Sequence, residues 1–226
     1  MKSNRNAVII PTRGRGRKIR DRILESQANA GSSAFYLSVD EDDLSDYTWA
    51  SLDGVGIVRG KNACMNEALN RAAIQLCFEY EFLTFMGDDH VARTKDWDLK
   101  LIEAAEALGP AAMAYANDLL AGESLPTAVL VDSKLVQRLG YMAPPVLRHM
   151  FLDDFWLEIG SRSKKLAYLN DVVLEHLHFS VGKSESDATY ENTNQNVKNL
   201  RDKFAYNLYK ITRLKRDLKK LASSAD

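Results

Sequence analysis

Cysteine is scarce in this chain of 226 residues, which contains only Cys64 and Cys77. Both fall in one predicted helix, where their separation turns the two side chains to different faces. This placement argues against a disulfide between them, because that bond needs Cα atoms within about 7 Å of each other. A scaffold held together by disulfides is excluded, and reduced thiols in a cytoplasmic setting are predicted.

Long hydrophobic runs are also absent. The amino-terminal stretch MKSNRNAVIIPTRGRGR has an apolar run of only four residues. A transmembrane helix needs about 20 consecutive apolar residues, and no segment reaches that length. We therefore predict neither a signal peptide nor a membrane span. Internal repeats and low-complexity linkers are missing as well, and hydrophobic residues, at 46%, suffice for one sizeable core.

An excess of charge of one sign is missing too, since the formal net charge is −1. The charges are nevertheless segregated along the chain. An early basic segment contains Arg13, Arg15, Arg17, Lys18, Arg20 and Arg22. An acidic segment contains Asp40, Glu41, Asp42, Asp43 and Asp46, and a basic tail runs from residue 198 to residue 220. Charge patches of this kind predict ionic ligands.

The first 90 residues alternate short apolar runs with amphipathic segments. Apolar runs predict strands at residues 7–11, 34–39, 55–59 and 81–86, and helical spacing predicts helices at 18–30 and 62–78. Alternating strands and helices favour a parallel sheet covered on both faces, which places the chain in the α/β class. Ligands of such sheets bind beyond the carboxyl ends of the strands. Those ends carry Thr12, Arg13, Asp40, Arg59, Asp88 and Asp89.

After residue 90 the pattern is looser. Helices are predicted at residues 95–109, 132–140, 149–165 and 191–222, and strands at 113–118, 127–131 and 171–179. Apolar residues of the last helix step by threes and fours, and this stripe is expected to dock on the rest of the protein. The stripe contains Val197, Leu200, Phe204, Leu208, Ile211, Leu214, Leu218 and Leu221.

Two adjacent carboxylates end the stretch FLTFMGDDH, residues 82–90. A turn or a helix cap needs only one acid, whereas Asp88 and Asp89 together suit a cation. The predicted strand DVVLEHLHF places His176 and His178 on one side, because side chains alternate along a strand. Carboxylates suit Mg²⁺ and Mn²⁺, and Mn²⁺ also accepts imidazole. The pattern predicts a metal site, beside the simpler interpretation of a turn and structural histidines.

Two further motifs each have a structural and a functional interpretation. PTRGRGR, residues 11–17, is either a solvated basic loop or a phosphate cradle in which glycines let backbone N–H groups approach the anion. DDFWLE, residues 153–158, is either a charged first helical turn or the source of a general base. Neighbouring helix positions differ by about 100°, so only one of Asp153 and Asp154 is expected to face a site.

Five features resemble, in this order, the GT-A nucleotide-sugar glycosyltransferases, especially the small ones that bacteriophages encode. They are VIIPTRGR, Asp40, FMGDDH, RHMFLDDFW and EHLHFSVGKSESDATY, which together cover residues 7–190. The resemblance implies a Rossmann-type mixed sheet flanked by helices. It also implies a GT-A-like catalytic domain at residues 1–190 and a long basic amphipathic helix at 191–226. The chain departs from the family where Gly87 replaces the first acid of the D-x-D motif and where Phe179 replaces a proline.

The resemblance also implies roles for individual residues. Asp89 with His176 or His178 holds Mn²⁺ or Mg²⁺, and Asp153 or Asp154 deprotonates the acceptor. The nucleotide sugar is bound by Pro11, Thr12, Arg13, Arg15, Asp40, Asn62 and Asp88. The implied activity is a metal-dependent, inverting transfer of a sugar from a nucleoside diphosphate sugar, with UDP-sugar favoured, to an acceptor hydroxyl.

The predicted acceptor is a hydroxymethylated pyrimidine in DNA, in the cytoplasm of a phage-infected host cell. The cations expected to contact DNA phosphates are Arg213, Lys215, Arg216, Lys219 and Lys220. One alternative is a cell-surface glycan or a lipid-linked acceptor at an anionic membrane. Others are a non-catalytic DNA-binding protein with this fold and a metal-dependent nuclease. The oligomeric state stays open.

Overall fold

The first strand shows why the sheet lies in the middle of the molecule. A computed structural model describes residues 4–177 and 196–222 of the chain. Strand β1 (Asn6–Pro11) is buried along its whole length. Ala7 and Ile9 belong to one cluster of buried side chains, whereas Val8 and Ile10 belong to the other. Its uninterrupted apolar run therefore requires covering layers on both faces of the sheet.

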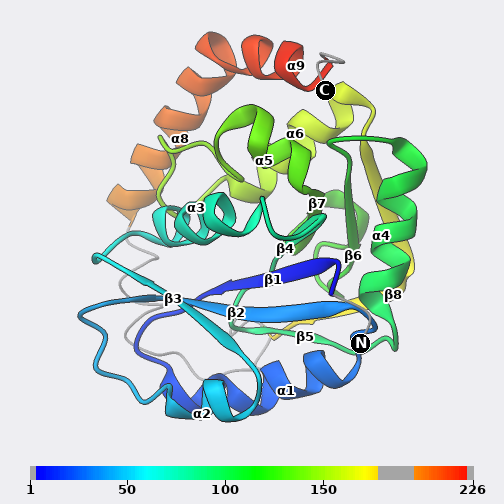
Figure 1. Cartoon of the computed structure of the whole chain (residues 1–226). Coiled ribbons are helices and arrows are strands. Elements are labelled where there is room, and N and C mark those ends of the chain that lie inside the picture. Colours follow the sequence, from blue (N-terminus) through cyan, green and yellow to red (C-terminus); the bar gives the residue numbers. More distant parts are fainter. Residues whose placement is uncertain (1–3, 178–195, 223–226) are drawn as a thin grey trace.

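The described strands form one mixed, eight-stranded sheet in the order β3-β2-β1-β4-β7-β6-β8-β5 (Figure 1). Strand β1 pairs in parallel with β2 and β4, and β2 pairs in parallel with β3. Strand β7 is antiparallel to β4 and β6, and β5 is antiparallel to β8. The remaining bounds are β2 (Ser33–Asp40), β3 (Gly56–Gly60), β4 (Phe82–Phe85), β5 (His90–Ala92), β6 (Met113–Asn117), β7 (Val129–Asp132) and β8 (Leu166–His176).

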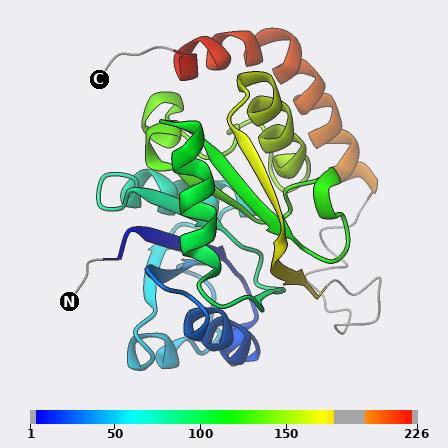
Figure 2. The same cartoon turned by 90° about the vertical axis from the view of Figure 1, so that its right-hand side faces the viewer.

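Helices cover the two faces as separate layers (Figure 2). One layer contains α3 (Met65–Leu76), α5 (Ser133–Leu139), α6 (Leu152–Ser163), α8 (Asn196–Thr212) and α9 (Leu214–Ala222). The other contains the 3₁₀ turn η1 (Gly16–Ile19), α1 (Arg20–Ala28), α2 (Thr48–Leu52) and α4 (Trp97–Leu108). A second 3₁₀ turn, η2 (Gly122–Ser124), lies between β6 and β7. In both views α9 lies at the opposite end of the molecule from α1 and α2.

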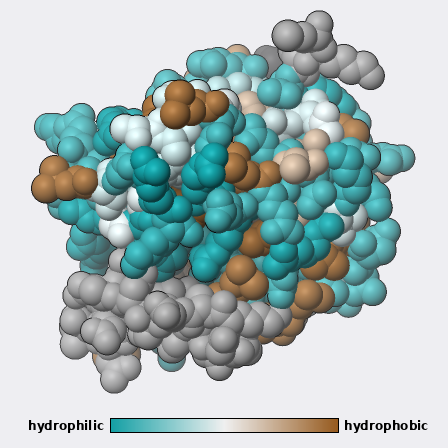
Figure 3. All heavy atoms as spheres, turned by 90° about the horizontal axis from the view of Figure 1, so that it is seen from below, coloured by the Kyte–Doolittle hydropathy of each residue, from teal (hydrophilic) through white to brown (hydrophobic). Residues whose placement is uncertain are grey.

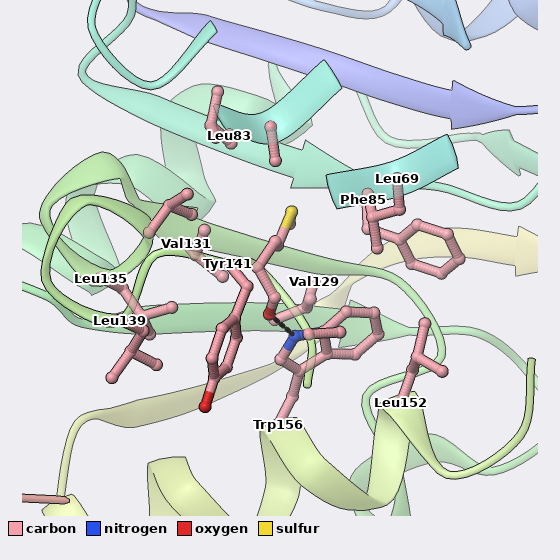
Figure 4. Close-up of a cluster of buried hydrophobic side chains, with 14 of the residues drawn as sticks. Leu69, Leu83, Phe85, Val129, Val131, Leu135, Leu139, Tyr141, Leu152 and Trp156 are labelled. Carbon is pink, nitrogen blue, oxygen red and sulfur yellow. Dashed lines mark hydrogen bonds between the residues drawn. The ribbon is translucent and has the colours of Figure 1, made fainter. Parts of the chain in front are cut away.

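Trp156 of α6 belongs to the larger core cluster (Figure 4). Its ring lies 5.2 Å from that of Phe85 in β4, centroid to centroid. Its indole Nε1 donates a 2.9 Å hydrogen bond to the backbone oxygen of Met142, so the polar atom of this fully buried side chain is paired. The contact fixes α6, and with it the acids of its first turn, against the sheet.

The predicted α/β class with a mixed sheet is confirmed, and two strands differ from the predictions. β5 was not predicted, because a strand of three residues gives no periodic signal. β8 begins at Leu166, five residues before the predicted start. Its first half pairs in parallel with β6 and is followed by a register shift at Ala116 and Asn117. This irregularity hides the strand from a search for simple alternation.

The predicted C-terminal helix is present, but as two helices. α8 ends at Thr212 and α9 begins at Leu214. Residues five apart in an unbroken helix differ by about 140° in direction. Tyr209 and Leu214 are both buried, so the chain has to change direction between them. The break turns α9 across the end of α5 and α6.

The prediction that the apolar stripe docks on the protein is wrong for α8. Leu200, Phe204, Leu208 and Ile211 are exposed. The docked face consists instead of Asp202, Tyr206 and Tyr209, which are buried. The hydroxyl groups of both tyrosines are hydrogen-bonded, which makes aromatic residues with a polar end suitable for this face. In α9 the prediction is right, since Leu214 and Leu221 are buried.

Candidate active site

Three strand ends bring predicted site residues together at one edge of the sheet. β1 ends at the buried Pro11 and is followed by Thr12, β2 ends at Asp40, and Asp88 follows β4. Thr12 Oγ1 donates a hydrogen bond of 2.7 Å to Asp88 Oδ2. The parallel pairing of β1 with β2 and β4 produces this convergence.

Arg13 joins two acids at the end of β2. Its guanidinium donates hydrogen bonds of 2.7 Å to Asp40 Oδ2 and Asp42 Oδ1. The side-chain amide of Asn62 donates to Asp42 Oδ2 at 2.9 Å. The hydrogen bonds from Arg13 are the main reason that the pKa of Asp42 lies below its usual value. Asp42 was not among the predicted site residues, although it belongs to the acidic segment.

Arg71 of α3 lies behind Asp40 and was also missed. Its Nη2 donates to the backbone oxygen of Val39 at 3.2 Å and lies 3.5 Å from Asp40 Oδ1. Its Nη1 donates to the backbone oxygen of Lys61 at 2.9 Å. Nothing in the sequence separates this arginine from other charged residues of an amphipathic helix.

Asp88 is held by groups from the first loop. Its Oδ1 accepts a hydrogen bond from Arg15, and the two side chains are only 14% and 10% exposed, respectively. Burial raises the pKa of Asp88 to about 6, against the opposing effect of Arg15 and with a contribution from neighbouring Asp89. The predicted residues Thr12, Arg15 and Asp88 therefore form one contact network.

The basic and acidic segments lie against each other. Besides the Arg13 pairs, Arg17 Nε lies 2.6 Å from Asp46 Oδ2. The backbone N–H of Gly14 donates to Asp43 at 2.8 Å, which closes the first loop onto the acidic segment. Part of the charge that predicted ionic ligands is thus neutralised within the protein.

Asp89, His90 and His176 form a cluster of side chains that suits a metal ion. Each offers one ligand atom, and these atoms lie within 4.8 Å of one another. His176 Nε2 is 3.3 Å from Asp89 Oδ2, and His90 Nδ1 is 3.2 Å from Asp89 Oδ1. In an octahedral shell with bonds of about 2.1 Å, adjacent ligand atoms are about 3 Å apart. The spacing and the carboxylate–imidazole chemistry fit a divalent cation such as Mn²⁺ or Mg²⁺.

The protonation of these side chains also suits a metal. His90 Nδ1 is buried, and among the described residues it lies 3.2 Å from Asp89 Oδ1 without the geometry of a hydrogen bond. Burial lowers the pKa of His90, so its imidazole is neutral near pH 7. Burial would raise the pKa of Asp89, but its interactions with the neighbouring imidazoles of His176 and His90 bring it well below its usual value. Neutral imidazole and ionised carboxylate are the forms that bind metals.

His90 joins the predicted His176 in this cluster. His178 lies outside the described residues, whereas the antiparallel pairing of β5 and β8 places His90 opposite His176. The two rings are stacked with centroids 4.2 Å apart. In the sequence, the one signal that could have identified His90 is that it directly follows Asp89.

Gly87 accounts for the missing first acid of the D-x-D motif. A Cβ atom at this position would lie 2.6 Å from Asp89 Oδ1 and 2.8 Å from His90 Nδ1. Any side chain here would have to push both groups aside. The close approach of Asp89 and His90 therefore requires glycine, and Asp88 takes over the contacts with the first loop.

Asp118 and Thr127 lie behind the histidines. Asp118 Oδ1 accepts hydrogen bonds of 2.8 to 2.9 Å from the backbone N–H groups of residues 120–122. Its Oδ2 accepts one from Thr127 and lies 4.0 Å from His176 Nδ1. Burial opposes ionisation of Asp118, but these hydrogen bonds lower its pKa. A carboxylate on the far side of a metal-binding histidine fixes the ring orientation.

Asp153 and Asp154 lie in the first turn of α6. Asp153 Oδ1 accepts a 3.0 Å hydrogen bond from the backbone N–H of Asp154. Burial raises the pKa of Asp153 to about 6, although that hydrogen bond opposes the rise. A carboxylate with a pKa close to neutral suits general base catalysis.

The loop before α6 is tied to the same sheet edge and to α8. The backbone N–H of Asn66, at the start of α3, donates to a carbonyl oxygen of this loop at 3.0 Å. From the other side, the carboxylate of Asp202 accepts hydrogen bonds of 2.9 to 3.2 Å from the backbone N–H groups of residues 148–150. Tyr206 Oη donates to the backbone oxygen of Asp154 at 2.9 Å. The C-terminal helix therefore helps to hold the segment that carries the two acids.

The cations predicted to contact DNA lie in or beside α9. Arg213, Lys215, Arg216 and Lys219 are exposed, and Lys220 is half-buried. They lie on the opposite side of the sheet from α1, which follows the loop of Arg13 and Arg15.

No family model matches the sequence, and no curated protein matches it. Solved structures do match. A mannosyltransferase from Pyrobaculum calidifontis, PcManGT, in complex with GDP-Man and Mn²⁺, has a TM-score of 0.56 and 13% identity over 98% of this chain and 74% of its own. Glucosyl-3-phosphoglycerate synthase from Mycobacterium tuberculosis, in complex with Mn²⁺, uridine diphosphate and phosphoglyceric acid, has a TM-score of 0.57 and 13% identity, with coverages of 80% and 73%.

A third match is TarS from S. aureus, with a TM-score of 0.56 and 15% identity over 75% of this chain. The chain covers 36% of TarS, so it spans about a third of that protein's length. Two of these neighbours are by name a mannosyltransferase and a glucosyl-3-phosphoglycerate synthase, and all three share the fold of this chain. The chain has the GT-A fold. At these identities the likeness shows the fold alone, and the GT-A fold is the one that the sequence motifs predicted.

Two further observations concern the chain as a whole. Within residues 4–177 and 196–222, no helix of the GT-A fold is both long and apolar enough to cross a membrane. The two cysteines are free and cap the two ends of α3.

Proposed function

We propose that this chain is an inverting glycosyltransferase that moves a sugar from a nucleoside diphosphate sugar to an acceptor hydroxyl and uses a divalent cation. One observation carries the proposal. Asp89, His90 and His176 lie at the same sheet edge as Thr12, Arg13 and Asp40. Two structural neighbours hold Mn²⁺ together with GDP-Man or uridine diphosphate, which supports this combination of ligands.

Each part of the edge has a role in this proposal. Pro11, Thr12, Arg13, Asp40 and Asn62 contact the nucleoside, with UDP-sugar favoured, and Arg15 and Asp88 lie between it and the metal ligands. Asp89, His90 and His176 hold the cation, which when bound stabilises the negative charge of the departing diphosphate. With two imidazoles in the set, Mn²⁺ is favoured over Mg²⁺.

Asp153 or Asp154 acts as the general base. It takes the proton of the acceptor hydroxyl, whose oxygen forms a bond to the anomeric carbon while the bond from that carbon to the diphosphate breaks. A single displacement from the opposite face inverts the anomeric centre, and one carboxylate suffices for it.

A thermal-shift experiment tests the nucleotide and metal site. The melting temperature is measured with UDP-glucose and with GDP-mannose, each with and without Mn²⁺. A ligand present at about 100 times its Kd stabilises the folded state by about 2.7 kcal/mol, so we expect a clear rise with nucleotide and Mn²⁺ together. Asp89→Ala should abolish this rise, whereas Asp21→Ala, at an exposed acid of α1, should keep it. An unchanged response of Asp89→Ala would exclude the proposed metal site.

For the acceptor we propose a hydroxymethylated pyrimidine in DNA, in the cytoplasm of a phage-infected host. The exposed cations of α9 support it, because phosphate contacts release counterions and make affinity fall with salt. A filter-binding salt titration compares wild type with a variant in which Arg213, Lys215, Arg216, Lys219 and Lys220 are replaced by Gln. The variant should bind DNA more weakly and with a flatter salt slope.

A control variant with Lys100→Gln and Lys134→Gln, at exposed positions outside α8 and α9, should behave as wild type. If wild type shows no DNA affinity even at low salt, DNA is not the acceptor. A cell-surface glycan or a lipid-linked acceptor would then take its place.

A further inference from the structure

The outward face of α8 carries a stripe of large apolar side chains. Leu200, Phe204, Leu208 and Ile211 are 65%, 72%, 49% and 82% exposed. Their spacing of four, four and three residues keeps them within about 80° of one another around the helix and extends them over about 16 Å along it. We call these four residues the α8 stripe. Contiguous exposed apolar residues of this kind mark interaction sites, whereas single ones do not.

The face of the molecule with α1 and α2 has a different character. The face that carries α1 and α2 is mainly hydrophilic, and its apolar groups are interspersed among polar ones (Figure 3). Leu44 precedes α2 by four residues and Leu52 is the last residue of α2, and they are 98% and 86% exposed. The α8 stripe therefore differs from ordinary exposed leucines.

Cations border the α8 stripe, and acids are kept away from it. Lys203 and Lys210 are exposed on one side of the stripe and Arg201 on the other. Residues 200–222 contain only two acids, and both face inward. Asp202 accepts hydrogen bonds from the backbone of residues 148–150, and Asp217 accepts them from Tyr141 and Tyr209. The outward surface of α8 and α9 thus offers apolar groups and positive charge without negative charge.

This combination limits what can cover the α8 stripe. A second copy of the chain would bring an identical cationic face, and like charges across an interface oppose association. A DNA backbone would neutralise the cations but would leave the four apolar side chains without an apolar partner. The surface of an anionic lipid bilayer supplies both groups, because acyl chains lie directly beneath negatively charged headgroups.

We infer that the α8 stripe seats the protein on an anionic membrane surface. The four apolar side chains enter the boundary between headgroups and acyl chains, while Arg201, Lys203 and Lys210 extend sideways to lipid phosphates. The cations of α9 lie beside this contact and add to it electrostatically. The inference stands on the surface of α8 alone and does not depend on sugar transfer.

The position of the α8 stripe has a meaning for the proposed function. The face of α8 opposite the stripe holds residues 148–150 through Asp202 and the start of α6 through Tyr206. The membrane would therefore lie one helix diameter from the acids proposed as the general base. On the basis of the proposed function, this placement would bring a lipid-linked acceptor, the alternative to DNA, close to that base.

Vesicle co-sedimentation tests the inference. The full chain is mixed with vesicles of phosphatidylcholine, either alone or with phosphatidylglycerol. We expect it to sediment with the anionic vesicles only, and to be released as salt rises. Phe204→Asn combined with Ile211→Asn should lower the affinity by about tenfold or more, because two of the inserted side chains become polar. Both positions are more than 70% exposed, so the variant should fold.

Leu44→Asn combined with Leu52→Asn is the matched control, since it removes equally exposed apolar residues far from α8 and should leave the affinity unchanged. The response of each variant to UDP-glucose and Mn²⁺ is measured alongside, so that a failure of the nucleotide site and a failure of the membrane site are told apart. The inference would be overturned if the wild type did not sediment with anionic vesicles at low salt. It would also be overturned if the α8 variant bound these vesicles as tightly as the wild type. The inference would also be overturned if the wild type formed a dimer or bound DNA and the α8 variant lost that association.

Discussion

Side chains at the carboxyl edge of the sheet are held by contacts that leave little room for change. Asp88, Asp89 and His90 are consecutive, yet they point into two different networks. Asp88 contacts Thr12 and Arg15 of the first loop, whereas Asp89 and His90 face His176. Asp88 thus contacts the first loop while its neighbours Asp89 and His90 form the candidate metal site. Gly87 leaves the space that Asp89 and His90 need for this arrangement.

Replacing Gly87 should therefore damage the metal site without touching a ligand. In Gly87→Ala the new Cβ displaces Asp89 Oδ1 and His90 Nδ1, which it would otherwise approach to 2.6 and 2.8 Å. We expect the affinity for Mn²⁺ to fall by about 10-fold or more, a loss typical of disturbed ligand orientation. Calorimetric titration with Mn²⁺ measures it, and circular dichroism checks the fold. Wild-type affinity in this variant would show that the cluster does not bind the metal as described.

The protonation of the general base should determine how activity depends on pH. Burial raises the pKa of Asp153 to about 6, and only the ionised carboxylate can accept a proton. If Asp153 is the base, activity is fully present above this pKa and is lost as the pH falls through it, with about a tenfold decrease in kcat/KM from pH 7 to pH 5. A pH–rate profile of the wild type measures this.

Amide substitutions distinguish the two acids. Asp153→Asn should reduce kcat by about 10²-fold or more while the affinity for the nucleotide sugar stays the same, because Asp153 is not among the residues proposed to contact the nucleotide. Asp154→Asn is the matched control of equal size and charge change. The reverse result would assign the base to Asp154, and near-wild-type turnover of both variants would place the base elsewhere.

At the scale of elements, α8 connects the C-terminal region with the candidate base. Asp202 is buried and accepts hydrogen bonds from three successive backbone N–H groups of the loop before α6. Backbone donors buried without a partner are costly, so this carboxylate determines where the loop lies.

Asp202→Ala should destabilise the protein by about 3 kcal/mol, because buried backbone donors lose a charged acceptor. Urea denaturation followed by circular dichroism measures the free energy of unfolding. Lys203→Ala, one position along on the exposed side of α8, should change that value by no more than about 0.5 kcal/mol. Equal stabilities of the two variants would contradict the role given to Asp202.

The elements also show what the sequence could and could not predict. The ends of β1, β2 and β4 were predicted with their site residues, because buried parallel strands are continuous apolar runs and their carboxyl ends share one edge. β5 was not, because three residues form a strand only through their pairing with β8, which is 70 or more residues away. His90 was missed for this reason.

The orientation of α8 was beyond sequence reasoning for another reason. Its leucines and its tyrosines form two stripes on opposite faces, and either could dock. The choice depends on partners elsewhere in the chain, such as the backbone of residues 148–150 and the carboxylate of Asp217. Arg71 and Asp118 likewise gain their positions from tertiary contacts, which no local pattern encodes.

At the scale of the molecule, the two C-terminal helices are part of the core. Tyr209, Leu214 and Leu221 belong to the same cluster of buried side chains as Phe155 and Trp156. The division into a catalytic domain at residues 1–190 and a helix at 191–226 stays a prediction, but the packing makes the first part dependent on the second.

A chain that ends at residue 190 should therefore lose cooperative folding. Removal of α8 and α9 exposes Tyr141 and Phe155 and deprives the loop before α6 of Asp202. Thermal unfolding followed by near-ultraviolet circular dichroism should show no sharp transition. The variant with Phe204→Asn and Ile211→Asn, which changes only the outer face of α8, should keep one. A sharp transition of the shortened chain would establish residues 1–190 as an independent domain.

The side chains of Asp202 and Asp217 point inward, which affects how charge is distributed over the molecule. The whole chain is almost neutral, with 30 basic and 31 acidic residues, yet residues 200–222 hold eight cations and only these two acids. The compensating negative charge lies in the rest of the protein, so the molecule is an electric dipole whose positive pole is the end with α9. Such a dipole rotates in the field of a negatively charged surface before contact is made. The protein would thus arrive with α8 and α9 leading, already turned toward what it binds.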